Sequence, residues 1–238
     1  YGLTQLRALH LKKVKKTLSE FFIFLPISNL LTLSLEFDPY AYIQSEDMAI
    51  FIPALSKMEK LENISILSQN EYAIDEDDLN ELVLEISKLK SLKTFRVRAG
   101  YVCIMKTFLE NFRNNSLVSL DANLTVDSAI LVDLFGKFIS KQNKLVELTL
   151  DTLFTEPPFF TDFAKHLRKA TQLKKLSLLI DEQKHFVNFK DFTDALKNLK
   201  ELTSLVLKIH ESFIIDGLIK ILLQELTKLP KIRSLKPI

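Results

Sequence analysis

Residues 145–150 read Leu145-Val146-Glu147-Leu148-Thr149-Leu150, with leucine at positions 1, 4 and 6 of a six-residue unit. The same apolar spacing recurs eight more times along the 238 residues of the chain. The nine units begin at Leu6, Leu30, Leu61, Leu92, Leu117, Leu145, Leu173, Leu202 and Ile232, and the last of them is incomplete. Successive units start 24, 31, 31, 25, 28, 28, 29 and 30 residues apart. The chain is therefore a tandem repeat with a period of roughly 28 residues.

Each unit predicts a β-strand, because apolar and polar residues alternate within it at period 2. The segments between units place apolar residues at helical spacing, and the clearest stripe is Leu79, Leu82, Val83, Ile86 and Leu89. The acidic run Asp75–Asp78 before this stripe favours a helix N-terminus. Further helices are expected to open at Asp127 or Ser128 and at Thr161 or Asp162. Strands that alternate with helices predict parallel strands joined by right-handed crossovers.

From Leu6 to Leu235, the repeat resembles the leucine-rich repeats of the ribonuclease-inhibitor-like class. The resemblance implies an α/β solenoid, a curved horseshoe with a parallel β-sheet on its concave face and α-helices on its convex face. In that family an Asn or Cys stands at the ninth position of the unit and bonds the backbone as the strand turns away. Here the ninth positions are Val14, Asp38, Gln69, Gly100, Thr125, Leu153, Asp181 and His210. We therefore expect each turn to find its own hydrogen-bond partners.

The unbroken repeat predicts a single leucine-rich-repeat domain over residues 1–238, with about eight to nine units that each pack on their neighbours. The chain begins at Tyr1 in the middle of the pattern, so we expect it to be a fragment of a longer protein. Solenoid ends normally carry polar caps, and neither end shows one. We expect at least one end to be covered by further residues or by another subunit.

The composition excludes several classes of protein. The 32 basic and 30 acidic residues largely cancel, which argues against a nucleic-acid partner. The sequence contains no run of 18 or more uncharged apolar residues, so we expect no membrane span. Cys103 is the single cysteine, which excludes an internal disulfide framework and fits a reducing, cytoplasmic compartment.

The sequence also lacks the motifs of the common enzyme classes. Its 4 glycines are too scattered to build a phosphate-binding loop. Its 4 histidines are scattered as well, and none stands at i,i+4 from another, so a zinc-binding helix is excluded. Carboxylates such as Glu147 and Asp151 are expected on an open sheet, where nothing raises a pKa for acid–base chemistry. We expect no enzyme activity, no cofactor and no metal.

The predicted concave face is the candidate binding surface, because unit positions 3, 5 and 7 point away from the core. Its candidate contact residues are Arg96, Arg98, Asp121, Glu147, Asp151 and Lys175. The signs of these charges alternate in bands, an arrangement that suits a partner of complementary charge. The alternative is that they are ordinary solvated strand residues. The face holds no aromatic residue, so Arg96 and Arg98 are its expected anchors.

Two other segments are more apolar than a surface needs. Phe21–Leu25 lies in the first helical segment, and Pro157–Phe160 precedes a helix, where a loop is expected. Each is either part of the core or an exposed partner site, and Phe159 and Phe160 are the candidate contact residues of the second.

These observations predict a non-catalytic protein–protein interaction or scaffold module that binds a protein partner and belongs to a larger assembly. The alternative is the recognition domain of a regulatory protein, such as a ubiquitin-ligase adaptor, an immune-type receptor or a GTPase activator.

Overall fold

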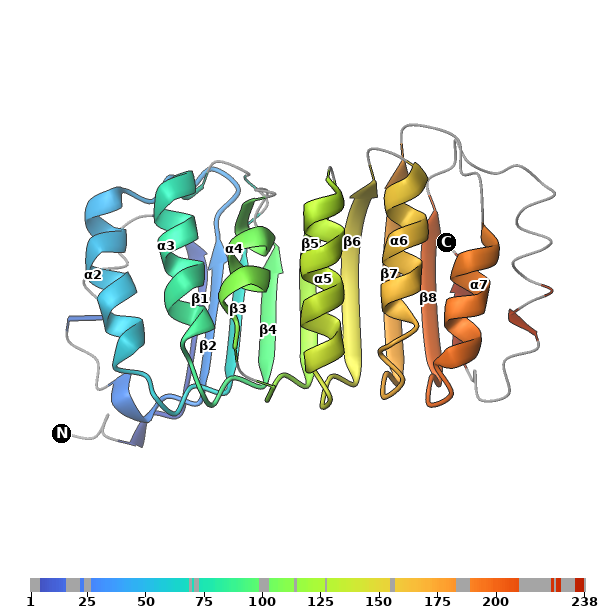
Figure 1. Ribbon diagram of the computed structural model, residues 1–238. Coiled ribbons are helices and arrows are strands. Elements are labelled where there is room, and N and C mark those ends of the chain that lie inside the picture. Colours follow the sequence, from blue (N-terminus) through green and yellow to red (C-terminus); the bar gives the residue numbers. More distant parts are fainter. Residues whose placement is uncertain are drawn as a thin grey trace. The chain divides into compact units, whose positions relative to one another are not determined.

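The computed structural model shows strands and helices alternating along the chain (Figure 1). It describes residues 5–15, 22–23, 27–68, 70, 73–98, 103–113, 115–126, 128–154, 157–182, 189–209, 224, 226–227 and 234–237. The chain divides into two compact units, Tyr1–Asn123 and Leu124–Ile238, and the division falls within strand β5.

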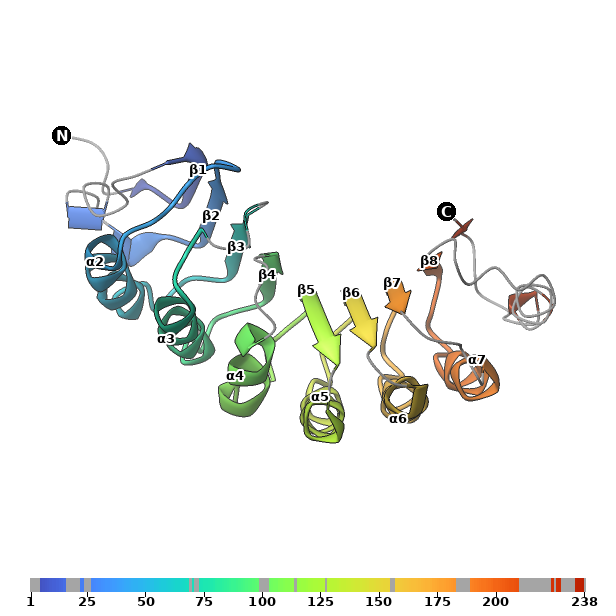
Figure 2. The ribbon, with the colours of Figure 1, turned by 90° about the horizontal axis from the view of Figure 1, so that it is seen from above.

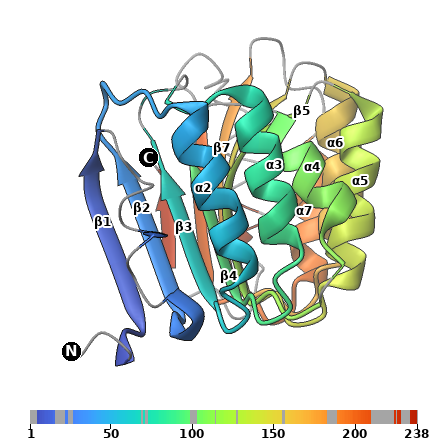
Figure 3. The same cartoon turned by 90° about the vertical axis from the view of Figure 1, so that its left-hand side faces the viewer.

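The first unit is a parallel sheet with helices on one face. Its strands, in sheet order, are β1 (Ala8–Val14), β2 (Thr32–Phe37), β3 (Asn63–Leu67), β4 (Thr94–Arg98) and β5 (Ser119–Val126). A short 3-10 helix η2 (Ile27–Asn29) and the helices α2 (Ser45–Ser56), α3 (Glu76–Ser87) and α4 (Cys103–Asn111) connect them. Figure 2 shows α2, α3 and α4 in one layer and the strands in another, and Figure 3 shows β1, β2 and β3 running in the same direction.

The second unit repeats this arrangement. Strands β6 (Glu147–Phe154), β7 (Lys175–Glu182), β8 (Ser204–Ile209) and β9 (Ser234–Pro237) pair in parallel, in chain order. Helices α5 (Ala129–Lys141), α6 (Pro157–Leu167) and α7 (Phe189–Asn198) lie side by side on one face of the strands (Figure 2). This α/β fold, with parallel strands and with helices on one face of them, is the fold that the sequence predicts.

The leucine motifs form the core, because equivalent positions of neighbouring strands are register partners. Leu33 pairs with Ile64, Ile64 with Phe95 and Phe95 with Leu120, while Leu148, Leu176 and Leu205 form the same row in the second unit. All of these side chains are at most 1% exposed. Leu9 in β1 is only half-buried, so the predicted row of fully buried side chains does not extend to β1.

Phenylalanines fill the space between strands and helices. The Phe95 ring of β4 lies 4.5 Å from the Phe108 ring of α4, and Phe108 lies 4.8 Å from Phe112. In the second unit Phe135 of α5 and Phe163 of α6 have ring centroids 4.7 Å apart. All five of these rings are buried, so phenylalanine packing joins the strands to the helices in both units.

Two helix starts agree with the sequence and one does not. The predicted stripe is buried, in α3 and at Leu89 just after it, and the Asp75 carboxylate caps the helix by accepting a hydrogen bond from the Asp77 backbone N–H at 3.0 Å. Ser128 caps α5 by accepting from the Leu131 N–H. The expected start of α6 at Thr161 or Asp162 is wrong, because the helix begins at Pro157. Proline suits the first helical turn, where a backbone N–H has no partner within the helix.

The strand exits differ from one repeat to the next, as expected without a shared Asn or Cys. After β2, the Asp38 N–H donates to the Val14 carbonyl at 3.0 Å. After β3, the Asn70 side-chain amide donates to the Ala41 carbonyl at 3.0 Å. Strands β5, β6 and β7 instead continue through their ninth positions, Thr125, Leu153 and Asp181, so the chain does not turn there. Gln69, Gly100 and His210 lie outside the described residues.

Candidate partner-binding surface

The predicted contact residues lie on the face of the strands opposite the helices, which we call the strand face. Arg96 and Arg98 belong to β4 and Asp121 to β5, in the first unit. Glu147 and Asp151 belong to β6 and Lys175 to β7, in the second. The buried motif residues alternate with them along each strand, so the period-2 pattern places the charges opposite the core.

In the first unit, Asp121 binds both arginines. The Arg96 Nε lies 2.8 Å from Asp121 Oδ2, while the Arg98 Nε and Nη2 lie 3.0 and 2.9 Å from Asp121 Oδ1. Arg96 and Asp121 are register partners in the β4–β5 ladder, and Arg98 reaches the same carboxylate diagonally. We call these three residues the arginine fork.

The arginine fork holds two guanidinium groups in fixed positions with a net positive charge. Two positive charges share one carboxylate, and the Asp121 side chain is 19% exposed while those of Arg96 and Arg98 are 45% and 39% exposed. A guanidinium has five N–H donors, so each arginine keeps donors for a second acceptor. Charge-assisted, two-point bonds to a carboxylate are the recognition that arginine performs best.

The second unit holds a simpler charge pair. The Lys175 Nζ lies 2.5 Å from Glu147 Oε1, and these residues are register partners in the β6–β7 ladder. Both side chains are well exposed, so the pair contributes little to stability. Asp151 is half-buried on β6, and its register partner is the apolar Leu179. The charge bands of the sequence are therefore partly paired with one another across adjacent strands.

A groove of about 570 Å³ opens beside the arginine fork, at the carboxyl ends of the strands in the first unit. Its lining residues are Lys13, Glu36, Phe37, Asp38, Pro39, Leu67, Ser68, Arg96 and Arg98. A bulge in β1 at Lys13, whose backbone φ is 54°, interrupts the pairing of β1 with β2 there. The two arginines thus belong both to the strand face and to the groove.

Among the described side chains, each apolar segment has one phenylalanine buried in the core. Phe160 is 2% exposed and lies 5.6 Å from the ring of Phe192 in α7, which agrees with the core-filling alternative. Phe159, its neighbour in α6, is half-buried. In the Phe21–Leu25 segment Phe22 is buried against Phe51, Ile23 is 59% exposed, and the other residues lie outside the described ones.

Two exposed tyrosines were not among the predicted contact residues. Tyr40 is 94% exposed and Tyr42 is 61% exposed, in the segment between β2 and α2. The sequence does contain a pattern that indicates their exposure. Tyr40 and Tyr42 alternate with Ala41 and Ile43, directly after the turn-forming pair Asp38-Pro39. The motif positions alone do not reach this segment, because it follows the strand.

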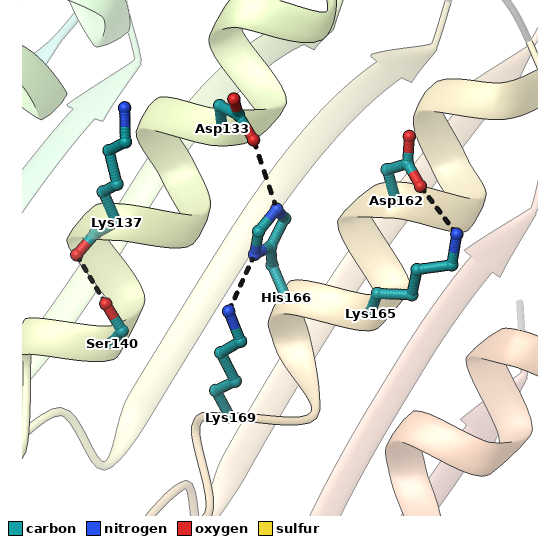
Figure 4. A network of polar contacts seen from close by, with 7 residues as sticks. All are labelled: Asp133, Lys137, Ser140, Asp162, Lys165, His166 and Lys169. Carbon is teal, nitrogen blue, oxygen red and sulfur yellow. Dashed lines mark hydrogen bonds and ion pairs between the residues drawn. The ribbon is translucent and has the colours of Figure 1, made fainter.

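A polar cluster joins α5 and α6 on the helix face of the second unit (Figure 4). The ring of His166 lies with Nε2 3.7 Å from Asp133 Oδ1 and Nδ1 3.4 Å from Lys169 Nζ. Burial of the ring and the nearby Lys169 charge lower the pKa of His166, and Asp133 opposes them. In the same cluster, Asp162 raises the pKa of Lys165 through a hydrogen bond of 2.9 Å. Within the described part of the chain, no group of three or more potential metal ligands occurs.

Strand–helix units with the leucine motif buried in register give this chain the fold of a leucine-rich-repeat protein. A structural match is the leucine-rich-repeat-containing protein LegL7 from Legionella pneumophila, with 13% sequence identity and a TM-score of 0.41, over 98% of this chain and 83% of that chain. No protein-family model and no curated protein matches the sequence. No helix among the described residues has the length and apolarity to cross a membrane.

Proposed function

We propose that this protein is a non-catalytic protein–protein interaction module, a scaffold subunit of a larger assembly, that binds its partner on the strand face through Arg96 and Arg98. The observation that carries the proposal is the arginine fork. Asp121 holds both guanidinium groups, so binding a partner does not require ordering two long, mobile side chains. Arginine is enriched among the residues that dominate the energy of protein interfaces.

The test is affinity purification of the full-length protein with identification of the chains that co-purify, followed by binding measurements with the purified partner. The Arg96→Ala/Arg98→Ala double variant should weaken partner binding at least tenfold and leave thermal stability nearly unchanged, because both side chains are partly exposed. Lys208→Ala, which removes an exposed charge on the strand face of β8, is the matched control and should bind normally.

Equal binding by the arginine variant and the wild type would contradict the proposal, as would a complex in which neither arginine is within hydrogen-bonding distance of the partner. The identity of the partner also addresses the alternative role. Co-purifying ubiquitin-ligase, receptor or GTPase components would indicate a recognition domain of a regulatory protein.

A further inference from the structure

The segment of residues 38–44, which we call the tyrosine loop, is held in place at several points. The Asp38 carboxylate accepts the Tyr40 N–H at 3.0 Å, and the Ala41 N–H donates to the Asp38 carbonyl at 2.9 Å. The Ile43 N–H donates to the Ala73 carbonyl at 2.7 Å. Ala41 and Ile43 are each 1% exposed. The loop backbone is therefore fastened to the neighbouring repeat.

In the position that these hydrogen bonds give the loop, its two tyrosine side chains are exposed to solvent. Tyr40 lies in the turn that the Ala41 N–H closes on the Asp38 carbonyl, and from there the exposed tyrosines alternate with the buried Ala41 and Ile43. An exposed aromatic ring on a fixed loop loses little conformational entropy when it binds, and tyrosine is enriched among interface hot spots. Among the described residues, Tyr40 is the most exposed of the large hydrophobic side chains.

The tyrosine loop and the arginine fork meet at the same groove. Asp38 and Pro39, the first residues of the loop, line the groove together with Arg96 and Arg98. The lining includes three basic and two acidic side chains, a net charge of +1. The acidic Asp38 is already engaged, by the Tyr40 N–H and by Lys15 at 3.8 Å. The arginine side is thus the place for a further negative charge.

We propose that the tyrosine loop, the groove and the arginine fork form one docking surface for an extended segment of a partner protein that carries an acidic side chain. The proposal rests on the interaction function proposed above and specifies the chemistry of the partner. The acidic side chain binds Arg96 and Arg98, and apolar parts of the segment pack on Pro39 and Tyr40. The groove volume, about 570 Å³, lies in the range of roughly 300–1,000 Å³ that is usual for ligand clefts.

A single-stranded nucleic acid also binds tyrosine and arginine side chains, by stacking and by charge. The groove disfavours it, because the carboxylates of Glu36 and Asp38 line the path that a phosphate backbone would follow. An acidic side chain brings one negative charge to the arginine side, whereas a nucleic acid brings one at every nucleotide.

The experiment selects peptides from a displayed random library on the whole 238-residue chain and measures the binding of the enriched peptide, made synthetically, by fluorescence anisotropy. The proposal expects enriched peptides to share an Asp or Glu. Replacing that residue by its amide should weaken binding at least tenfold. The Tyr40→Ala/Tyr42→Ala variant and Arg98→Ala should each do the same. Ile130→Ala, which truncates a 67% exposed apolar side chain on α5, is the matched control and should bind normally.

Four outcomes would overturn the proposal: no enriched peptide, an amide peptide that binds as well as the acid, insensitivity to the tyrosine variant, or competition by an oligothymidine probe. Failure of the proposed function is distinguishable from these. Binding that depends on Arg98 but not on the tyrosines refutes the docking surface and leaves the strand-face function standing. A natural partner that binds the arginine variant normally refutes the function itself.

Discussion

His166 and Gly136 are packed against each other at the joint between α5 and α6. A Cβ atom built on Gly136 would lie 2.1 Å from the Nδ1 and 2.4 Å from the Cγ of the His166 ring. Glycine inside a helix costs roughly 1 kcal/mol relative to alanine. Here the missing side chain makes room for the ring that contacts Asp133.

The first prediction is that Gly136→Ala destabilises the protein in spite of the better helix propensity of alanine. Overpacking typically costs about 1–3 kcal/mol, which exceeds the gain in propensity. In a His166→Ala background the obstacle is gone, so the same substitution should become neutral or stabilising. Urea denaturation of the four proteins of this cycle measures the effect, and an equal effect of Gly136→Ala in both backgrounds would refute the packing argument.

The second prediction concerns pH. The folded protein holds the pKa of His166 below its ordinary value of 6.5, so the unfolded chain binds the proton more readily. The stability linked to this ring is fully present above pH 6.5 and is lost as pH falls from there through the lowered pKa. The opposing charges of Asp133 and Asp162 reduce the size of the loss.

Denaturation midpoints at pH 7.5 and below pH 6, compared between the wild type and His166→Gln, check this prediction. The wild type should lose more stability on acidification than the variant, because glutamine does not titrate. Identical losses would show that His166 is not linked to folding.

The arginine fork shows what the sequence predicts at this scale. The sequence places Arg96, Arg98 and Asp121 on one face, because the strand period determines which side chains point away from the core. Their pairing depends on register, since only equivalent positions of adjacent strands lie opposite one another. The charge bands of the sequence alone therefore do not reveal that Asp121 binds both arginines.

At the scale of elements, the strands of the central repeats are the best-predicted part of the molecule. Their buried positions must match those of both neighbours, and a shift by one residue would expose the whole row. The helices are less constrained. The bounds of helix α2 are not apparent from the sequence, because Pro53 interrupts it and the run Ala49-Ile50-Phe51-Ile52 hides the helical period. Helix α6 was expected to start later, because its two prolines were interpreted as a loop.

The third prediction tests the strand core. Leu148→Ala should destabilise the protein by roughly 2–5 kcal/mol, because Leu148 is 1% exposed and has Leu176 as its register partner. Thr149→Ala, one residue further on the strand face, is the matched control and should cost much less. Chemical denaturation measures both, and an unchanged midpoint for Leu148→Ala would contradict the assignment of the core.

At the scale of the whole molecule, the distribution of tyrosines offers a direct test of domain organisation. All 5 tyrosines of the sequence (Tyr1, Tyr40, Tyr42, Tyr72 and Tyr101) fall in the first compact unit, and the chain has no tryptophan. Tyrosine fluorescence therefore reports on residues 1–123 alone, whereas far-UV circular dichroism reports on both units.

The fourth prediction is that both probes give the same urea midpoint, as expected for the single repeat domain predicted over residues 1–238. Each repeat is stabilised mainly by its neighbours, and the division between the units falls within one strand, so neither unit is expected to unfold alone. Two separate midpoints would show that the chain is two independent folding units.

The shared register of the strands has a consequence for how such a chain changes length. Residues 64–94 make up one full period, from Ile64 to the residue before its register partner Phe95. Loss of this block would join Asn63 directly to Phe95 and leave an intact leucine motif, Leu61-Glu62-Asn63-Phe95-Arg96-Val97. A gene encoding this protein can therefore gain or lose a whole period and still keep the leucine-motif positions of the remaining strands in register. Insertion of a single residue within a strand would move the residues after it to the opposite face of the sheet, unless a bulge like that of β1 takes up the extra residue.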